Sequence, residues 1–91
     1  MTELFWKVKN KNYTVYILEC SDKTFYVGST NDFEKRFHQH NNLKSGAHYT
    51  KIRRPVVLKH KEEFSTLKEV RAREAEIKRM KRQEKVELIA K

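Results

Sequence analysis

Glu74 is a carboxylate that falls on the apolar side of a predicted helix. On a helical wheel it lies among Leu67, Val70 and Ile77, which form the buried line of that helix. A carboxylate that faces a core is costly unless it is paired or binds a cation. One interpretation is a glutamate that pairs with an arginine or reaches out to water. The other is a metal site with a single carboxylate, because Mg²⁺ is often held by one or two carboxylates, with water and a substrate phosphate in its other positions.

Four further polar side chains could act beside such a site: two strand tyrosines and an arginine–histidine pair. Arg36 and His40 are four residues apart on a predicted helix, so they can aim at one point beside the sheet. Tyr16 and Tyr26 stand on two neighbouring strands. Each of the four is also compatible with a structural role, since exposed arginines and histidines are common and a buried tyrosine needs only one partner for its hydroxyl.

The two tyrosines can cooperate only if they project from the same face of the sheet. Side chains alternate faces along a strand, so the hairpin register decides this. Direct pairing of Cys20 with Phe25 around a four-residue loop would put Tyr16 and Tyr26 on opposite faces. A loop of three or five residues, or a bulge, would put them together. We predict the shared face.

The first half of the chain contains the elements that must position these groups. Residues 13–20 predict a strand that is apolar on both faces and therefore central. Residues 21–24 are turn formers, and residues 25–29 return as a second strand. The helix that follows is expected to start at Asn31, with Glu34 completing a capping box.

The second half is predicted to supply one strand and two helices. Residues 41–54 read as an irregular connection, and Pro55 opens a third strand over residues 55–64. Ser65 or Thr66 caps a long helix, which breaks or bends near Gln83 before a short final helix. The expected fold class is α+β, a three-stranded antiparallel sheet flanked by helices in the order β-β-α-β-α-α. We expect residues 1–12, which include Phe5 and Trp6, to be an extension and residues 13–91 to be one domain.

Composition limits the class of protein. A chain of 91 residues holds one core, and its only cysteine, Cys20, lies in an apolar run where it is expected to be a small buried hydrophobe. No stretch approaches the roughly 18 apolar residues of a membrane span. The first residues lack the features of a signal peptide. These features favour a soluble cytoplasmic protein that does not enter membranes.

Positive charge is concentrated in the middle of the chain. The formal net charge is +9, and residues 35–61 hold eight Lys or Arg, all four histidines and no acidic residue. Such a segment can dock a polyanion through phosphate contacts, and the alternative is a solvated basic loop. No Cys/His set has zinc spacing. The residues that we expect to contact nucleic acid are Lys35, His48, Tyr49, Lys51, Arg53 and Arg54, and the late run KRMKR is either a further contact or a solvated helix face.

Residues 13–82 resemble the GIY-YIG endonuclease superfamily, in particular its small single-domain bacterial branch. Thr14-Val15-Tyr16 stands where the family has GIY, and Tyr26-Val27-Gly28 stands where it has YIG. In GSTNDFEKRFHQHN, Arg36 is at the position of the catalytic arginine, and in REAEIK, Glu74 is at the position of the metal-binding glutamate. The first glycine and isoleucine of GIY are replaced here, a substitution that is frequent in the small branch.

The resemblance implies an endonuclease that hydrolyses DNA phosphodiesters with one Mg²⁺ or Mn²⁺. Glu74 would hold the metal, Arg36 would contact the scissile phosphate, and Tyr16 and Tyr26 would orient and deprotonate water. His40 is an alternative base, and the choice between Tyr16 and His40 is left open. No motif reads base edges, so we expect weak specificity or a preference for structured or single-stranded DNA, with a role in repair or recombination. The alternative is a nucleic-acid-binding module that keeps the fold with little catalysis. A protein partner is left open.

Overall fold

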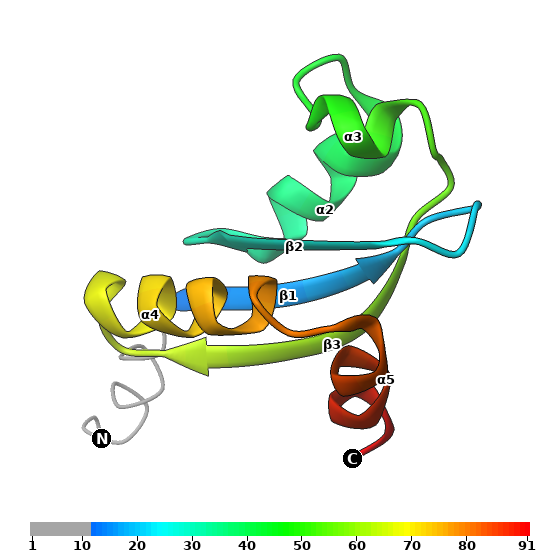
Figure 1. Cartoon of the computed structure of the whole chain (residues 1–91). Coiled ribbons are helices and arrows are strands. Elements are labelled where there is room, and N and C mark those ends of the chain that lie inside the picture. The colour runs from blue at the N-terminus through cyan, green and yellow to red at the C-terminus, as the bar shows by residue number, and fades with distance from the viewer. Residues whose placement is uncertain (1–11) are drawn as a thin grey trace.

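The computed structural model describes residues 12–91, and a three-stranded antiparallel sheet is its centre (Figure 1). The strands are β1 (Tyr13–Glu19), β2 (Phe25–Thr30) and β3 (Val57–Phe64), and their order in the sheet is β2-β1-β3. The strand with two apolar faces is therefore the central one, as the sequence predicts. The expected extension over residues 1–12, with Phe5 and Trp6, lies outside the described residues except for its last position.

The register of the β1–β2 hairpin places both tyrosines on one face. Glu19 pairs with Phe25, which leaves residues 20–24 as a five-residue loop. Tyr16 pairs with Gly28 and Leu18 pairs with Tyr26, so Tyr16 and Tyr26 point the same way. The predicted shared face is confirmed.

Helices cover both faces of the sheet (Figure 1). On one face, α2 (Phe33–Asn42) and α3 (His48–Lys51) cover a core that includes Tyr16, Leu18 and Cys20. On the other, α4 (Leu67–Lys78) and α5 (Arg82–Ala90) cover a second core of Val15, Ile17, Val27, Val70 and Ile77. The fold class and the order of the predicted elements agree with the structure. Among residues 12–91, no helix combines the length and the apolar character needed to cross a bilayer.

Several local expectations differ from the structure. The N-cap of α2 is Asp32, whose carboxylate accepts the backbone N–H of Lys35 at 3.2 Å, so the predicted capping box from Asn31 to Glu34 is wrong. Asp and Asn are equally good caps, and Thr30 decides between them because its hydroxyl accepts the N–H of Asp32 at 3.0 Å.

Other boundaries also shift by a few residues. The stretch read as irregular contains the short helix α3, and β3 begins at Val57 rather than at Pro55, which has no N–H for the ladder. Thr66 caps α4 as predicted, by accepting the N–H of Glu69 at 3.1 Å. The break between α4 and α5 falls at residues 79–81, a little before Gln83.

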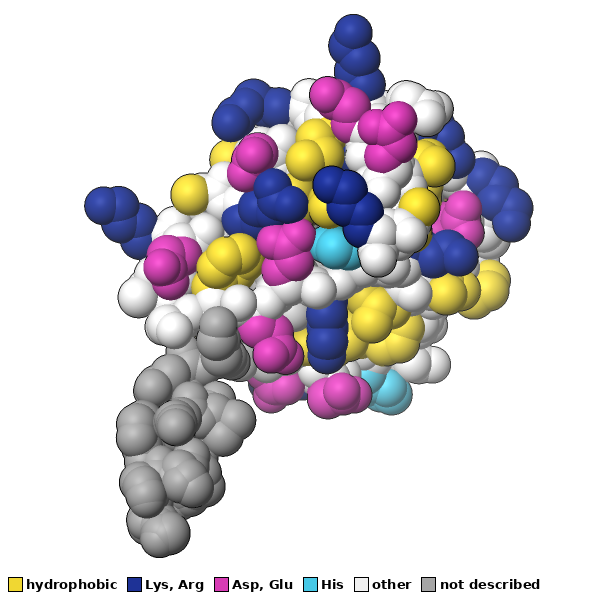
Figure 2. Space-filling view, turned by 90° about the horizontal axis from the view of Figure 1, so that it is seen from below, with side chains coloured by type: hydrophobic (Ala, Val, Ile, Leu, Met, Phe, Trp, Pro, Cys, Tyr) yellow, Lys and Arg dark blue, Asp and Glu magenta, His cyan; other side chains and the backbone are white. Residues whose placement is uncertain are grey.

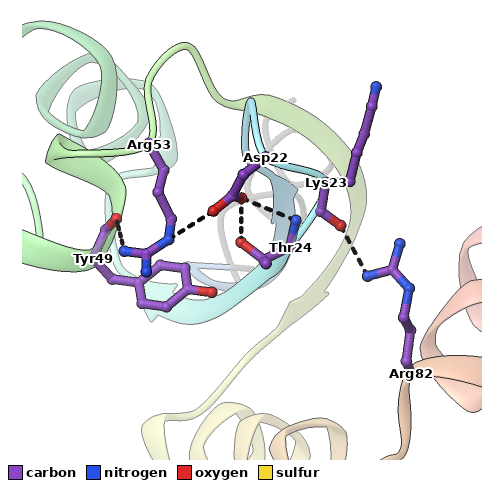
Figure 3. A network of polar contacts seen from close by, with 6 residues as sticks. All are labelled: Asp22, Lys23, Thr24, Tyr49, Arg53 and Arg82. Atoms are coloured by element: carbon purple, nitrogen blue, oxygen red, sulfur yellow. Dashed lines mark hydrogen bonds and ion pairs between the residues drawn. The ribbon is translucent and has the colours of Figure 1, made fainter.

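Two arginines fasten the tip of the hairpin to distant parts of the chain (Figure 3). Arg53 donates to the Asp22 carboxylate at 3.0 Å and to the Tyr49 carbonyl at 3.1 Å, and its guanidinium lies 3.9 Å from the Tyr49 ring centre. Arg82 donates to the carbonyl of Lys23 at 2.8 Å. The φ angle of Lys23 is 72°, so the loop needs a residue in the left-handed region at its tip. These contacts hold the hairpin that carries both tyrosines.

Candidate active site

Tyr16 is a buried phenol at the centre of the α2 face. It extends from β1, is 2% exposed, and its hydroxyl lies 2.9 Å from Nε2 of His40. Burial raises the pKa of Tyr16 to about 12, with a further increase from Tyr26, while the positive charge of Arg36 acts in the opposite direction. Tyr16 is therefore protonated at neutral pH, and almost no phenolate is present to act as a base.

His40 is a fully buried imidazole, which its spacing from Arg36 in the sequence does not indicate. Its Nδ1 lies 2.8 Å from the hydroxyl of Thr50 on α3, and the rings of Tyr16 and Tyr26 lie 5.7 and 5.0 Å from its own. Burial, followed by the charges of Arg36 and Arg54, lowers the pKa of His40 to about 4, so the imidazole is neutral. The two alternative bases are thus linked by a hydrogen bond, and neither is a separate solvent-facing group.

Gly28 leaves the space into which the two tyrosines fit. A Cβ atom at this position would lie 2.6 Å from Oη of Tyr16 and 3.1 Å from Cε2 of Tyr26. Real Cβ atoms do not approach other atoms as closely as the first of these distances. A side chain on Gly28 would therefore push Tyr16 away from His40.

We expect Gly28→Ala to destabilise the protein by about 1–3 kcal/mol, because the methyl group overpacks the space beside Tyr16. Urea denaturation measures this change. Tyr16→Phe removes the closest oxygen, so the same glycine substitution should cost less in a Tyr16→Phe background. An equal cost in both backgrounds would mean that the contact with the phenol is not the cause.

Arg36 extends from α2 beside an open depression of about 270 Å³ between the end of β2 and the helix. Its Nη1 donates to the side chain of Gln39 at 2.8 Å and to the carbonyl of Ser45 at 3.0 Å. The positive charge of Arg36 also lowers the pKa of both Tyr16 and His40. The depression is lined by Thr30, Asn31, Asp32, Lys35, Arg36 and Gln39.

Glu74 reaches the edge strand β2 from the helix on the opposite face. Its Oε1 accepts the hydroxyl of Ser29 at 2.6 Å, and its Oε2 pairs with the ammonium of Lys78 at 2.9 Å. Burial raises the pKa of Glu74, but the hydrogen bonds from Ser29 and Lys78 outweigh it, and the net effect is a lowered pKa. Glu74 is therefore an ionised, half-buried carboxylate, and its partner Ser29 follows Gly28 in the chain. The partner predicted as an arginine is a lysine, and Leu67, expected on the buried line, is 45% exposed.

Glu74 offers a hard cation one carboxylate, of which the Lys78 ammonium already contacts Oε2. Residues 12–91 contain no group of three or more His, Cys, Asp or Glu side chains that could hold a metal ion. A cation at Glu74 would therefore have one protein carboxylate, with the Ser29 hydroxyl beside it. Mg²⁺ is suited to such a site because it retains several waters, whereas zinc requires more protein ligands.

Part of the basic segment serves the fold itself. Arg54 donates to three backbone carbonyls at the end of α2, those of His40 at 2.6 Å, Gln39 at 3.0 Å and Leu43 at 2.6 Å. The Gln39 carbonyl also accepts the N–H of Leu43 at 3.2 Å, and the Leu43 carbonyl that of Gly46 at 3.1 Å. Arg54 therefore adds a side-chain cap to the end of α2, at the turn that carries His40. We therefore assign Arg54 a structural role, although the sequence analysis expects it to contact nucleic acid.

The other predicted nucleic-acid contacts differ in exposure. Lys35, His48 and Lys51 are exposed, and Lys51 donates to the carbonyl of Lys44 at 3.2 Å. Tyr49 and Arg53 are half-buried, and both belong to the contacts at the hairpin tip (Figure 3). Lys35 lines the same depression as Arg36, which makes it the best placed of the set.

Sequence reasoning missed Ser29 and Thr50, the two hydroxyls that bond the predicted site residues. Ser29 is 45 positions from Glu74, and Thr50 is ten positions from His40. Both are common residue types with no charge, and no spacing pattern connects them to their partners. The only signal was their place, directly after Gly28 and within the basic segment.

Comparisons with known proteins identify relatives of this chain along nearly its whole length. A sequence model described as the GIY-YIG catalytic domain matches residues 12–87. The chain is 59% identical over 80 residues to a UPF0213 protein of Syntrophus aciditrophicus, covering 88% of this chain and 91% of the relative. It is 49% identical over 81 residues to a UPF0213 protein of Staphylococcus saprophyticus, covering 89% and 96%.

Two solved structures have the same fold. The solution NMR structure of a UPF0213 protein from Bacillus halodurans aligns with a TM-score of 0.57 at 36% identity, covering 86% of this chain and 82% of that one. The solution NMR structure of a protein from E. faecalis aligns with a TM-score of 0.60 at 35% identity, with the same coverage. The names of these relatives state no substrate.

Proposed function

This chain belongs to the GIY-YIG catalytic domain family, and we propose that it is a divalent-metal-dependent DNA endonuclease whose residues 13–91 act as one domain. The observation that carries the proposal is a hydrogen-bonded cluster of side chains on one face of the sheet. Tyr16, Tyr26 and His40 meet on one face of the sheet above Gly28, with Arg36 beside them. Glu74 is bonded to Ser29, the next residue along β2.

The buried pair can receive the proton of the attacking water. Tyr16 alone cannot act as a base at neutral pH, because its pKa is about 12 and almost none of it is phenolate. Its hydroxyl is hydrogen-bonded to Nε2 of His40, so it can pass its own proton to the imidazole as it takes one from water. In the free protein the lowered pKa of His40 opposes this transfer. The half-buried Tyr26 is closer to solvent and would orient the water. A cation held by Glu74 would neutralise charge on the phosphate and support the leaving oxygen.

Arg36 and Lys35 would hold the scissile phosphate in the depression that both line. A planar guanidinium suits two phosphate oxygens, and a lysine adds a point charge. The acid-free segment 35–61 extends this positive charge over the side of the sheet that α2 and α3 cover. By contrast, Figure 2 shows acidic and basic side chains interspersed on the face seen from below. We therefore expect DNA on the α2–α3 side, bound through its backbone with weak sequence specificity.

The test is cleavage of single-stranded, branched and plasmid DNA by the purified protein, with and without Mg²⁺ or Mn²⁺. We expect Tyr16→Phe to lower the cleavage rate by roughly 10²–10⁴-fold, because it removes the group that exchanges the proton with His40. Tyr13→Phe is the matched control, since Tyr13 lies on the same strand and packs against the other core. Cleavage without added metal, or equal cleavage by wild type and Tyr16→Phe, would contradict the proposal.

A nucleic-acid-binding module with little catalysis is the second candidate. The observation that favours it is the ion pair at Glu74, in which the Lys78 ammonium is placed against the carboxylate that a metal would need. A binding measurement separates the two candidates. DNA binding by all variants, without cleavage by wild type at any Mg²⁺ or Mn²⁺ concentration, would support the module.

A further inference from the structure

Thr50 is a fully buried hydroxyl that connects the catalytic face to α3. Its Oγ1 lies 2.8 Å from Nδ1 of His40 and donates to the carbonyl of Ala47 at 3.0 Å. The bond to Ala47 is the usual bond of a helical threonine to an earlier carbonyl. Thr50 therefore sits behind His40, on the side away from Tyr16.

The direction of these bonds follows from the number of protons. A threonine hydroxyl has one proton, and a neutral imidazole carries one N–H. Because the Thr50 proton goes to the Ala47 carbonyl, Oγ1 can only accept from His40, and the proton of His40 is then on Nδ1. Nε2 keeps its lone pair and accepts the hydroxyl of Tyr16.

The reverse direction leaves a buried group without a partner. If His40 carried its proton on Nε2, the imidazole would donate to the phenol oxygen, and the Tyr16 proton would need another acceptor. Among residues 12–91, His40 is the one hydrogen-bond partner of the Tyr16 hydroxyl that can accept its proton, since Arg36 beside it has only donors. A buried donor without an acceptor is disfavoured, so the order Tyr16 to His40 to Thr50 to Ala47 is preferred.

We propose that Thr50 is a positioning residue that holds His40 in the Nδ1–H tautomer and so keeps Nε2 ready to accept the proton of Tyr16. The hydrogen bond at one imidazole nitrogen generally fixes the role of the other. In the other tautomer, the N–H at Nε2 would face the phenol, and this nitrogen could not accept the Tyr16 proton. The consequence for catalysis rests on the proposed nuclease function, whereas the tautomer is a property of the folded protein alone.

The tautomer can be read from the imidazole nitrogens by long-range ¹H–¹⁵N NMR of histidine-labelled protein at pH 7.5. The wild type and Thr50→Ser, which keeps the hydroxyl, are expected to show a protonated Nδ1 and an unprotonated Nε2 on His40. Thr50→Val, which keeps the shape, is expected to shift the proton to Nε2 or to give a mixture. If His40 of the wild-type protein carries its proton on Nε2, the proposal is overturned by that measurement alone. It is also overturned if Thr50→Val leaves the His40 proton on Nδ1, as in the wild type.

Cleavage kinetics then test the consequence. Thr50→Val is expected to lower kcat by roughly 10–100-fold with little change in KM, and Thr50→Ser is expected to retain most of the wild-type rate. Equal kcat values for the two variants would overturn the positioning role. If the wild type cuts no DNA, the proposed nuclease function fails, while the tautomer measured by NMR still supports or overturns the role of Thr50.

Discussion

Replacing Glu74 with glutamine is expected to reduce metal-dependent cleavage by about 10³-fold or more, because it removes the carboxylate charge that would hold the cation at this site. Glutamine has almost the same shape, and its amide oxygen can still accept the Ser29 hydroxyl. The fold should be nearly unaffected, since the lost pair with Lys78 is partly exposed and such pairs contribute less than about 1 kcal/mol. The measurements are the cleavage rate against Mg²⁺ concentration and DNA binding without metal.

Measurements of Mn²⁺ binding and of DNA affinity test this prediction separately from cleavage. Mn²⁺ binding, followed by electron paramagnetic resonance without DNA, should be weakened in Glu74→Gln and unchanged in Glu63→Gln, an exposed carboxylate on β3 that keeps 50% of its side chain in solvent. DNA affinity in the absence of metal should not fall, because removing a negative charge does not weaken attraction to phosphates. A Glu74→Gln protein that cuts within tenfold of wild type would show that Glu74 does not hold the metal.

The second large effect is a loss of stability in mild acid that originates at His40. Folding lowers the pKa of His40 from its ordinary 6.5 to about 4, so the unfolded chain binds more protons between these values. The contribution of His40 is fully present above pH 6.5 and is lost as the pH falls toward 4. The loss should reach about 2 kcal/mol by pH 5, which corresponds to a Tm lower by roughly 10 °C for a domain of this size.

Thermal unfolding between pH 7.5 and 5 measures the histidine effect separately from the carboxylates. The pKa values of Glu62 and Glu74 are lowered from 4.5, so the stability that they contribute is lost only at more acidic pH. His38→Gln, on the exposed side of the same helix, should keep the full pH dependence. His40→Gln should be less stable at pH 7.5 and nearly independent of pH over this range. A wild-type Tm that stays constant from pH 7.5 to 5 would contradict the prediction.

Much of the fold could be predicted because it depends on local patterns. The double-sided apolar strand at residues 13–20 became the central β1, and the parity of the hairpin loop placed Tyr16 and Tyr26 together. Thr66 began its helix as expected. One error was a choice between two acceptable neighbours. Asp32 rather than Asn31 caps α2 because Thr30, at the end of a strand, bonds the N–H of Asp32.

The candidate site could be predicted as a set of residue types and not as an arrangement. The motifs selected Tyr16, Arg36, His40 and Glu74, but they did not show that His40 is enclosed. The spacing of residues also did not show that Arg54 caps the end of α2, which lies more than ten positions earlier in the chain. These facts depend on which elements pack above each side chain, and those elements come from distant parts of the chain.

The sequence alone was sufficient to predict the family motifs, the class of fold, the central strand and the concentration of positive charge. Each of these depends on neighbouring residues or on regular spacing along the chain. Packing in three dimensions settled the rest. It buried Tyr16 and His40 together, joined Glu74 to Ser29 across the sheet edge, and placed Thr50 behind the imidazole. The physical reason is that the pKa of a side chain and the direction of its hydrogen bonds are set by burial and by partners, which exist only once the separate elements have met.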